Sequence, residues 1–222
     1  MDTPNLHIEE FLKYYYSFEQ EPGYAVLLKG KWGTGKTWFI KRTLNSFSKK
    51  NGKHLYVSLY GVTSFDQIED EFFKQLHPLL SSKSMALTGK IAKGLLKATL
   101  KIDLDHDGKS DGSVSAQAPD LNLPEYLTNT SGFVIVFDDL ERASMNLEAL
   151  LGYINHYVEH QGYKVIIIAN EEEIIAHQEK QEDFKIAYKR IKEKLIGKSF
   201  EINPDLSDAL VNFISEMRTV DT

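Results

Sequence analysis

The 222 residues are enough for one substantial domain and the start of another. Hydrophobic residues make up 42% of the chain and charged residues 26%, which is typical of a globular protein with a buried core. The absence of cysteine excludes disulfides, thiol catalysis and cysteine-ligated metal sites, and a net charge of -6 argues against general nucleic-acid binding. The first ten residues are polar and acidic, unlike a secretory signal, and no apolar run approaches the length of a membrane span. We therefore expect a cytoplasmic protein without a transmembrane segment.

Apolar periodicity predicts an alternation of helices and strands along the chain. In chain order we expect a helix over 6–18, a strand over 24–29, a helix over 38–47, a strand over 55–59, and a helix that begins at a capping box formed by Ser64 and Gln67 and runs to about 80. The pattern resumes with a strand over 133–137, a helix over 146–160, a strand over 164–169, helices over 171–178 and 183–196, a strand over 200–202 and a helix over 205–217. This alternation predicts an α/β fold with a parallel sheet covered on both faces.

Residues 81–131 interrupt the alternation and read as an insertion. Its first part has five lysines from Lys83 to Lys101 and no acid, which leaves a weak hypothesis of contact with a membrane surface. A solvated helix face is the commoner meaning of such a pattern. We expect one domain over 1–203 that contains this insertion, followed over 204–222 by the start of a helical segment.

A glycine-rich loop lies between the strand over 24–29 and the next helix and matches the pattern G-x-x-x-x-G-K-[ST] in full. Its glycines let backbone N–H groups approach phosphates, and the helix that follows points its positive end at the same anion. We expect Lys36 to contact the β- and γ-phosphates and the Thr37 hydroxyl to bind magnesium. The predicted nucleotide-binding residues are Gly30, Lys31, Trp32, Gly33, Thr34, Gly35, Lys36 and Thr37.

A second motif is the apolar strand over 133–137 that ends in two adjacent carboxylates. In a phosphate-loop fold, Asp138 would lie across from Thr37 and bind magnesium through a water molecule. Asp139 follows at the position where many ATPases place a glutamate that orients the attacking water. Because aspartate is one methylene shorter, either the geometry compensates, or Glu141 assists, or hydrolysis is slow. The alternative for Asp139 is a helix cap.

Further polar residues follow the later strands. In a sheet of the order 5-1-4-3-2, the strand over 164–169 lies between the phosphate-loop strand and the acidic strand, so Asn170 would face the γ-phosphate and could position water. The alternative is that Asn170 caps the next helix. Candidate stabilisers of phosphate charge, each more often part of a solvated helix face, are Arg142, Arg190, Lys192 and Lys194.

Two other patterns could indicate ligand binding, but for each we favour a purely structural explanation. Tyr14, Tyr15 and Tyr16 could include a ring that stacks on adenine, but such rings usually pack a helix onto the core. His156 and His160 have a spacing that can bind zinc, but the apolar stripe of their helix leaves both facing solvent, and no third ligand is nearby.

The two motifs together resemble the KAP family of P-loop NTPases, within the additional-strand group related to AAA+ and STAND ATPases. The resemblance rests on Gly30-Lys31-Trp32-Gly33-Thr34-Gly35-Lys36-Thr37 and on Asp138-Asp139-Leu140-Glu141-Arg142, where Glu141 replaces the usual aspartate. It implies a three-layer P-loop fold that binds ATP, with Mg²⁺ as cofactor. It also implies a longer protein with a helical lid, so residues 204–222 would be either the truncated beginning of that lid or part of a reduced member of the family. Some bacterial members exclude bacteriophage, so an antiviral role is an expectation at the family level.

The sequence therefore predicts a magnesium-dependent ATPase domain that drives a conformational switch or assembly, with Asp139, Lys36, Asn170 and Glu141 as catalytic candidates and Thr37 and Asp138 at the metal. We expect ATP as the ligand, and a homo-oligomer or further domains of a longer protein as partners. An alternative is a nucleotide-binding switch or scaffold that hydrolyses ATP slowly or not at all. A small-molecule kinase is a third reading, for which no acceptor pocket is apparent.

Overall fold

The computed structural model describes residues 4–49, 52–76, 133–176 and 182–205. The chain divides into two compact units, one formed by Met1–Gly61 with Gly132–Thr222 and the other by Val62–Ser131. The predicted insertion over 81–131, with the stretch from Lys83 to Lys101, lies outside the described residues, as does nearly all of the segment over 204–222.

The first unit is built on a parallel sheet whose described strands have the order β2-β3-β4-β1-β5. This confirms the predicted order 5-1-4-3-2, and the strands are β1 (Ala25–Lys29), β2 (His54–Ser58), β3 (Val134–Asp138), β4 (Lys164–Ala169) and β5 (Ile196–Glu201). Every residue of β3 and β4 is buried, which explains why these strands are continuously apolar up to their ends.

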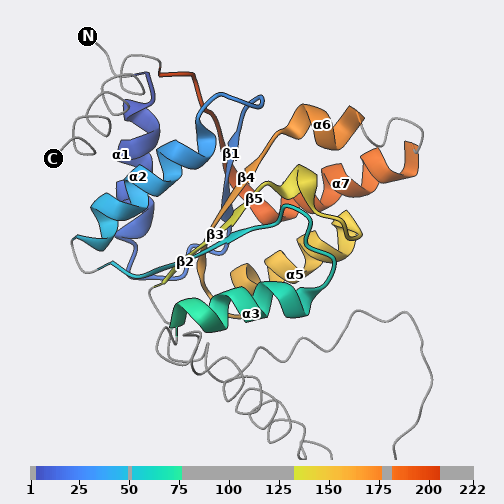
Figure 1. Ribbon diagram of the computed structural model, residues 1–222, viewed down its shortest axis with the longest axis horizontal. Helices are drawn as coiled ribbons and strands as arrows, with labels where there is room; N and C mark the ends of the chain where they lie inside the picture. The colour runs from blue at the N-terminus through green and yellow to red at the C-terminus, as the bar shows by residue number, and fades with distance from the viewer. Residues whose placement is uncertain (1–3, 50–51, 77–132, 177–181, 206–222) are drawn as a thin grey trace, which may run out of the picture. The chain divides into compact units, whose positions relative to one another are not determined.

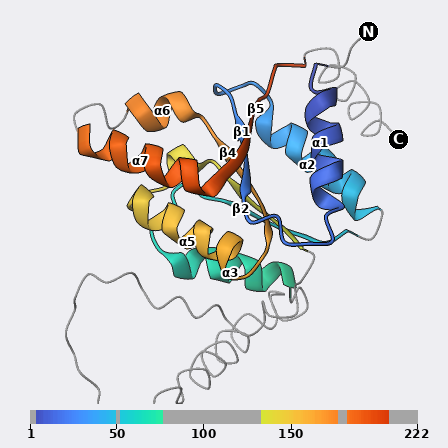
Figure 2. The ribbon, with the colours of Figure 1, turned by 180° about the vertical axis from the view of Figure 1, so that it is seen from behind.

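Helices cover both faces of this sheet, as Figures 1 and 2 show from opposite sides. Helices α1 (Leu6–Tyr16) and α2 (Lys36–Ser48) pack on one face, where Ile8 and Phe39 join Val136 and Ile166 of the sheet in one apolar cluster. On the other face lie α5 (Leu147–Glu159) and α7 (Glu182–Leu195), and α6 (Glu171–Ala176) follows β4. The predicted three-layer arrangement is thus confirmed.

Strand β5 differs from its predicted bounds, since it begins at Ile196 rather than at residue 200. It lies at the edge of the sheet and pairs with β1 alone among the described strands, so most of its side chains are exposed and polar. Its backbone pairing slips by one residue at Gly197, where a Cβ atom would lie 2.4 Å from the Tyr24 ring. Main-chain pairing and not an apolar pattern therefore defines this strand.

Helix α5 begins at Leu147, where Asn146 caps it by accepting a hydrogen bond from Ala149 N–H at 2.9 Å. Its apolar stripe is buried as predicted, but the expectation that both histidines face solvent is wrong for His156. His160 is exposed, whereas the Nε2 atom of His156 is buried and has no hydrogen-bond partner among the described residues. No group of three metal-binding side chains occurs in the described part of the chain.

The described part of the second unit consists of α3 (Phe65–Leu76) and the residues before it. The side-chain bond of the predicted capping box goes to a backbone group one residue earlier than expected. Gln67 Oε1 accepts a 2.9 Å hydrogen bond from the N–H of Thr63 and not from that of Ser64. The apolar stripe of this helix buries Ile68, Phe72 and Phe73.

Within the described ranges, no helix has both the length and the apolar character that a membrane crossing requires.

Candidate functional site

The phosphate loop connects β1 to α2 at the carboxyl edge of the sheet. Its first residue, Gly30, donates its N–H to the Ala169 carbonyl at 3.3 Å, which fixes the loop to the end of β4. A Cβ atom at Gly30 would lie 2.8 Å from Thr34 Oγ1, so the loop is too tight for a side chain there. Gly35 has a φ of 84°, a left-handed conformation that favours glycine. Gly33, with a φ of 81°, shares this conformation, and together Gly33 and Gly35 give the loop its curvature.

Lys36 lies within this loop and is only 9% exposed. Its Nζ donates hydrogen bonds to the carbonyls of Gly30 at 2.7 Å and Lys31 at 3.0 Å. Burial lowers the pKa of Lys36, and the nearby acids Glu141, Asp138 and Asp139 act in the opposite direction. All three acids of the second motif therefore lie close enough to influence this ammonium group.

Thr37 and Asp138 join the two motifs directly. The Thr37 hydroxyl donates a 2.7 Å hydrogen bond to Asp138 Oδ2, across 101 residues of sequence. Asp138 is 1% exposed, and its other oxygen accepts the N–H of Asp139 at 2.8 Å. Burial raises the pKa of Asp138, while its hydrogen bonds from Tyr56 and Thr37 lower it.

The side chain of Asp139 does not cap the helix that follows it. Its backbone has a φ of 59°, an uncommon left-handed conformation for a residue other than glycine, and its side chain makes no cap bond to the short helix η2 (Leu140–Arg142). Instead, Asp139 Oδ2 accepts a 2.9 Å hydrogen bond from the Ser58 hydroxyl at the end of β2. The carboxylate therefore lies at the same edge of the sheet as the phosphate loop.

Glu141 is bonded to the loop itself, because Trp32 Nε1 donates to its Oε1 at 3.0 Å. Its Oε2 is buried without a hydrogen-bond partner among the described residues. Next to it, the Arg142 guanidinium lies 5.6 Å from the centre of the Trp32 ring and 4.4 Å from that of Tyr60. Trp32 is thus fixed by an acid at its edge and a cation at its face.

Asn170 follows β4 and is 4% exposed. Because β4 lies between β1 and β3, Asn170 comes to the same edge as the phosphate loop and the acidic pair. Its backbone carbonyl accepts the Ile174 N–H at 3.3 Å and so begins α6.

Two of the other cationic candidates are bonded to acidic side chains. Lys192 forms an ion pair with Glu171, and Lys194 donates to Glu159 at 3.1 Å. Arg190 is exposed on α7.

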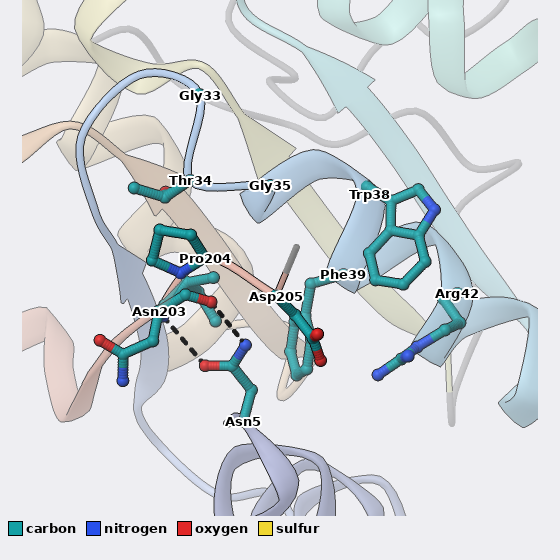
Figure 3. Close-up of a pocket in the computed structure, with 11 residues that line it drawn as sticks. Asn5, Gly33, Thr34, Gly35, Trp38, Phe39, Arg42, Asn203, Pro204 and Asp205 are labelled. Atoms are coloured by element: carbon teal, nitrogen blue, oxygen red, sulfur yellow. Dashed lines mark hydrogen bonds between the residues drawn. The ribbon is translucent and has the colours of Figure 1, made fainter. Parts of the chain in front are cut away.

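A cavity of about 120 Å³ opens beside the loop (Figure 3). Loop residues Gly33–Gly35 form one side, Trp38 and Arg42 of α2 a second, and Asn203–Asp205 after β5 a third. Asn5 closes it from the start of α1, where its amide donates to the Asn203 carbonyl at 2.8 Å and accepts the Asn203 N–H at 3.0 Å. Sequence reasoning missed this cavity because no local pattern indicates that residues 198 positions apart are in contact.

The triple tyrosine of α1 does not contribute to this cavity. Tyr15 is fully buried and donates to the Tyr24 carbonyl at 2.8 Å, and Tyr16 packs on Phe47 with ring centres 4.5 Å apart. Exposed Tyr14 packs edge-on against Phe18. The favoured alternative, that these rings pack the helix onto the core, is the one observed.

The donor atoms at this edge suit magnesium. They are hydroxyl and carboxylate oxygens, which hard divalent cations prefer. Because the Thr37 hydroxyl donates its hydrogen bond to Asp138, the lone pairs of its oxygen are available to a cation. Magnesium in such sites is usually bound by one or two protein groups together with substrate phosphates and water, so a larger cluster of acids is not required.

The sheet order, the phosphate loop and the acidic strand end define a nucleotide-binding domain of the P-loop NTPase class. The sequence model of the KAP family P-loop domain matches residues 5–221. The chain belongs to this family, as its two motifs predicted.

The remaining comparisons add little to this assignment. No curated protein matches the chain. Among solved structures, one titled as the crystal structure of a DNA replication initiation factor is 12% identical, with a TM-score of 0.44 over 100% of this chain and 53% of that one. The crystal structure of DnaI is 16% identical, with a TM-score of 0.46 over 92% of this chain and 84% of the other. The chain thus spans about half the length of the first of these proteins.

Proposed function

We propose that the chain binds ATP together with magnesium at the phosphate loop and hydrolyses the γ-phosphate. The observation that supports this most directly is the 2.7 Å contact between Thr37 and Asp138, which unites the phosphate loop with the acidic strand. A glycine-rich turn that merely happened to contain a lysine would have no reason to meet a buried carboxylate from another strand.

Each residue of the loop and the strand end has a part in this proposal. The loop N–H groups would bind the phosphates, and Lys36 would exchange its two backbone carbonyls for the β- and γ-phosphate oxygens. Thr37 and Asp138 would bind magnesium, which neutralises charge that develops on the phosphates.

Hydrolysis would proceed by attack of water on the γ-phosphorus. The bond to the bridging oxygen breaks, ADP leaves with that electron pair, and Asp139 accepts the proton of the water. Asn170, at the neighbouring strand end, would help to orient the same water molecule.

The cavity beside the loop is the proposed site of the purine base. Trp38 and Phe39 give it an apolar wall next to the phosphate loop, as expected for a ring whose phosphates lie on Gly33–Gly35.

The proposal predicts that Lys36→Ala abolishes measurable ATP binding, because the buried ammonium is the principal cation in the loop. Asp139→Ala should keep ATP binding and lower turnover by roughly 10²- to 10⁴-fold, the range for loss of a general base. Calorimetry with ATP and magnesium, and phosphate release under saturating ATP, measure the two effects. Lys49→Ala, which alters an exposed lysine at the end of α2, is the matched control and should behave as the wild type. Undiminished turnover in Lys36→Ala would remove the site.

A second candidate function is a nucleotide-binding switch with little hydrolysis. Two hydrogen bonds favour it: Asp139 accepts from Ser58, and Glu141 accepts from Trp32, so one oxygen of each acid that could act on water is engaged. Tight retention of ATP with negligible phosphate release would select this function over the first.

In either case the nucleotide would drive a conformational change that is passed to further domains or subunits. Molecular mass measured with and without ATP tests for assembly. A role in exclusion of bacteriophage is a further proposal, which rests on the family alone.

A further inference from the structure

Tyr56 makes a contact at the acidic strand end that neither sequence motif includes. Its hydroxyl donates a 2.7 Å hydrogen bond to Asp138 Oδ2, the same oxygen that accepts from Thr37. With the Asp139 N–H on the other oxygen, three donors therefore fix one buried carboxylate.

The register of the sheet explains how a tyrosine at this position reaches Asp138. Tyr56 of β2 pairs with Val136 of β3, and Ser58 pairs with Asp138. Residues two apart in a strand point to the same face and lie about 6.6 Å apart, a distance that the phenol ring spans. Lys41 of α2 lies over the ring, with Nζ 4.8 Å from its centre, so the ring is fixed between a helix and the neighbouring strand.

The consequence for the site follows from burial. A carboxylate that is 1% exposed cannot be oriented by bulk water, so its rotamer depends on the protein groups that bond to it. Thr37 lies in the first turn of α2, directly after the phosphate loop, whereas Tyr56 is on a strand of the sheet. Of the two side-chain donors, Tyr56 is thus the one whose position does not depend on the state of the phosphate loop.

We propose that Tyr56 is a positioning residue for the metal–nucleotide site, where it fixes Asp138 and thereby turns the lone pairs of Thr37 towards the cation. This inference rests on the proposed function, since it assumes that nucleotide binds with magnesium. Tyr56 would not touch the nucleotide itself, so it should affect binding only through magnesium.

The test is Tyr56→Phe, which keeps the ring and its packing and removes only the hydroxyl. The Mg²⁺ concentration that gives half-maximal enhancement of binding of a non-hydrolysable ATP analogue should rise roughly 10- to 100-fold, the usual effect of losing an outer-sphere partner. Affinity for the analogue in EDTA should stay at the wild-type value. Both are measured by calorimetry on the full chain.

Tyr153→Phe is the matched control. It also deletes a buried tyrosine hydroxyl, which is in a 2.7 Å hydrogen bond with Tyr157 on α5. Its thermal midpoint should fall with no change in the Mg²⁺ dependence. Equal weakening by Tyr56→Phe with magnesium and in EDTA, or a wild-type Mg²⁺ dependence, would overturn the inference. Failure of the wild type to bind the analogue at all would instead overturn the proposed function, together with this inference.

Discussion

Asp138 is an acidic side chain that the fold removes almost entirely from solvent. Burial raises the pKa of its carboxyl group, the neighbouring charge of Asp139 adds to this, and hydrogen bonds from Tyr56 and Thr37 offset part of the rise. A group whose pKa is raised on folding contributes stability at pH values below its unfolded pKa, and this contribution is lost as the pH rises through the folded value. Ionisation of Asp138 in this buried position therefore lowers the stability of the free protein as the pH rises.

We accordingly predict that Asp138→Asn unfolds at a higher temperature than the wild type at neutral pH, by about 2–4 °C for each kcal/mol gained. Asparagine can still accept the Asp139 N–H, and the Tyr56 and Thr37 hydroxyls can turn to accept from its amide. The same variant should lose the magnesium enhancement of ATP binding. Thermal scans from neutral to acidic pH check the sign, because the difference should shrink as the wild-type carboxyl takes up its proton. Glu10→Gln, at an exposed position of α1, is the control and should not raise the unfolding temperature. An Asp138→Asn protein that unfolds at a lower temperature than the wild type at neutral pH would contradict the argument.

Among the elements, the buried strands could be predicted well and the edge strand could not. The predicted strand over 164–169 coincides with β4, because a strand covered on both faces is apolar over most of its length, here Val165–Ala169. Only the end of β5 was predicted, since Gly197, Lys198 and Ser199 are exposed and have no apolar alternation. What makes them a strand is hydrogen bonding to β1, which side-chain patterns do not encode.

In the candidate site, too, some residues could be predicted from the sequence and others could not. The phosphate loop and the acidic pair could be found because each is a contiguous motif whose chemistry needs fixed residues at fixed spacing. Tyr56, Ser58 and Asn5 were missed, since each acts by touching a residue more than 80 positions away. Their roles depend on strand register and helix docking, which follow from the assembled fold.

Helix α5 has a histidine whose protonation the fold opposes. Burial lowers the pKa of His156, and the nearby imidazole of His160 lowers it further. Since the folded pKa lies below the unfolded one, the stabilising effect is present above about pH 6.5 and is lost as the pH falls through the lowered value.

We predict that acid weakens the protein partly through this residue. His156→Gln cannot take up the proton, so its thermal midpoint should fall less than that of the wild type between about pH 7 and about pH 5. The matched change His7→Gln, at an exposed position of α1, should keep the wild-type pH dependence. Parallel curves for His156→Gln and the wild type would contradict this assignment.

At the scale of the whole described fold, one side chain connects its first helix to the segment that follows its last strand. Asn5 stands at the start of α1, where asparagine usually caps its own helix, but its amide makes no such bond. It forms hydrogen bonds instead with both backbone groups of Asn203. The preceding residue, Ile202, donates its N–H to the Lys29 carbonyl at 2.8 Å. The start of α1, the edge of the sheet and one wall of the cavity are thereby joined.

Asn5→Ala should therefore affect both stability and nucleotide binding. It leaves the N–H and carbonyl of Asn203 without their partner, a loss of about 1–2 kcal/mol, which corresponds to a fall in thermal midpoint of roughly 2–8 °C. Because the same contact closes the cavity, affinity for ATP and for adenosine alone should fall by a similar factor, since the phosphate loop is unchanged. Asn155→Ala, which removes an exposed hydrogen bond to Glu159 within α5, is the control and should change neither affinity. A lower midpoint with undiminished affinity for both ligands would show that Asn5 supports the fold only and that the base binds elsewhere.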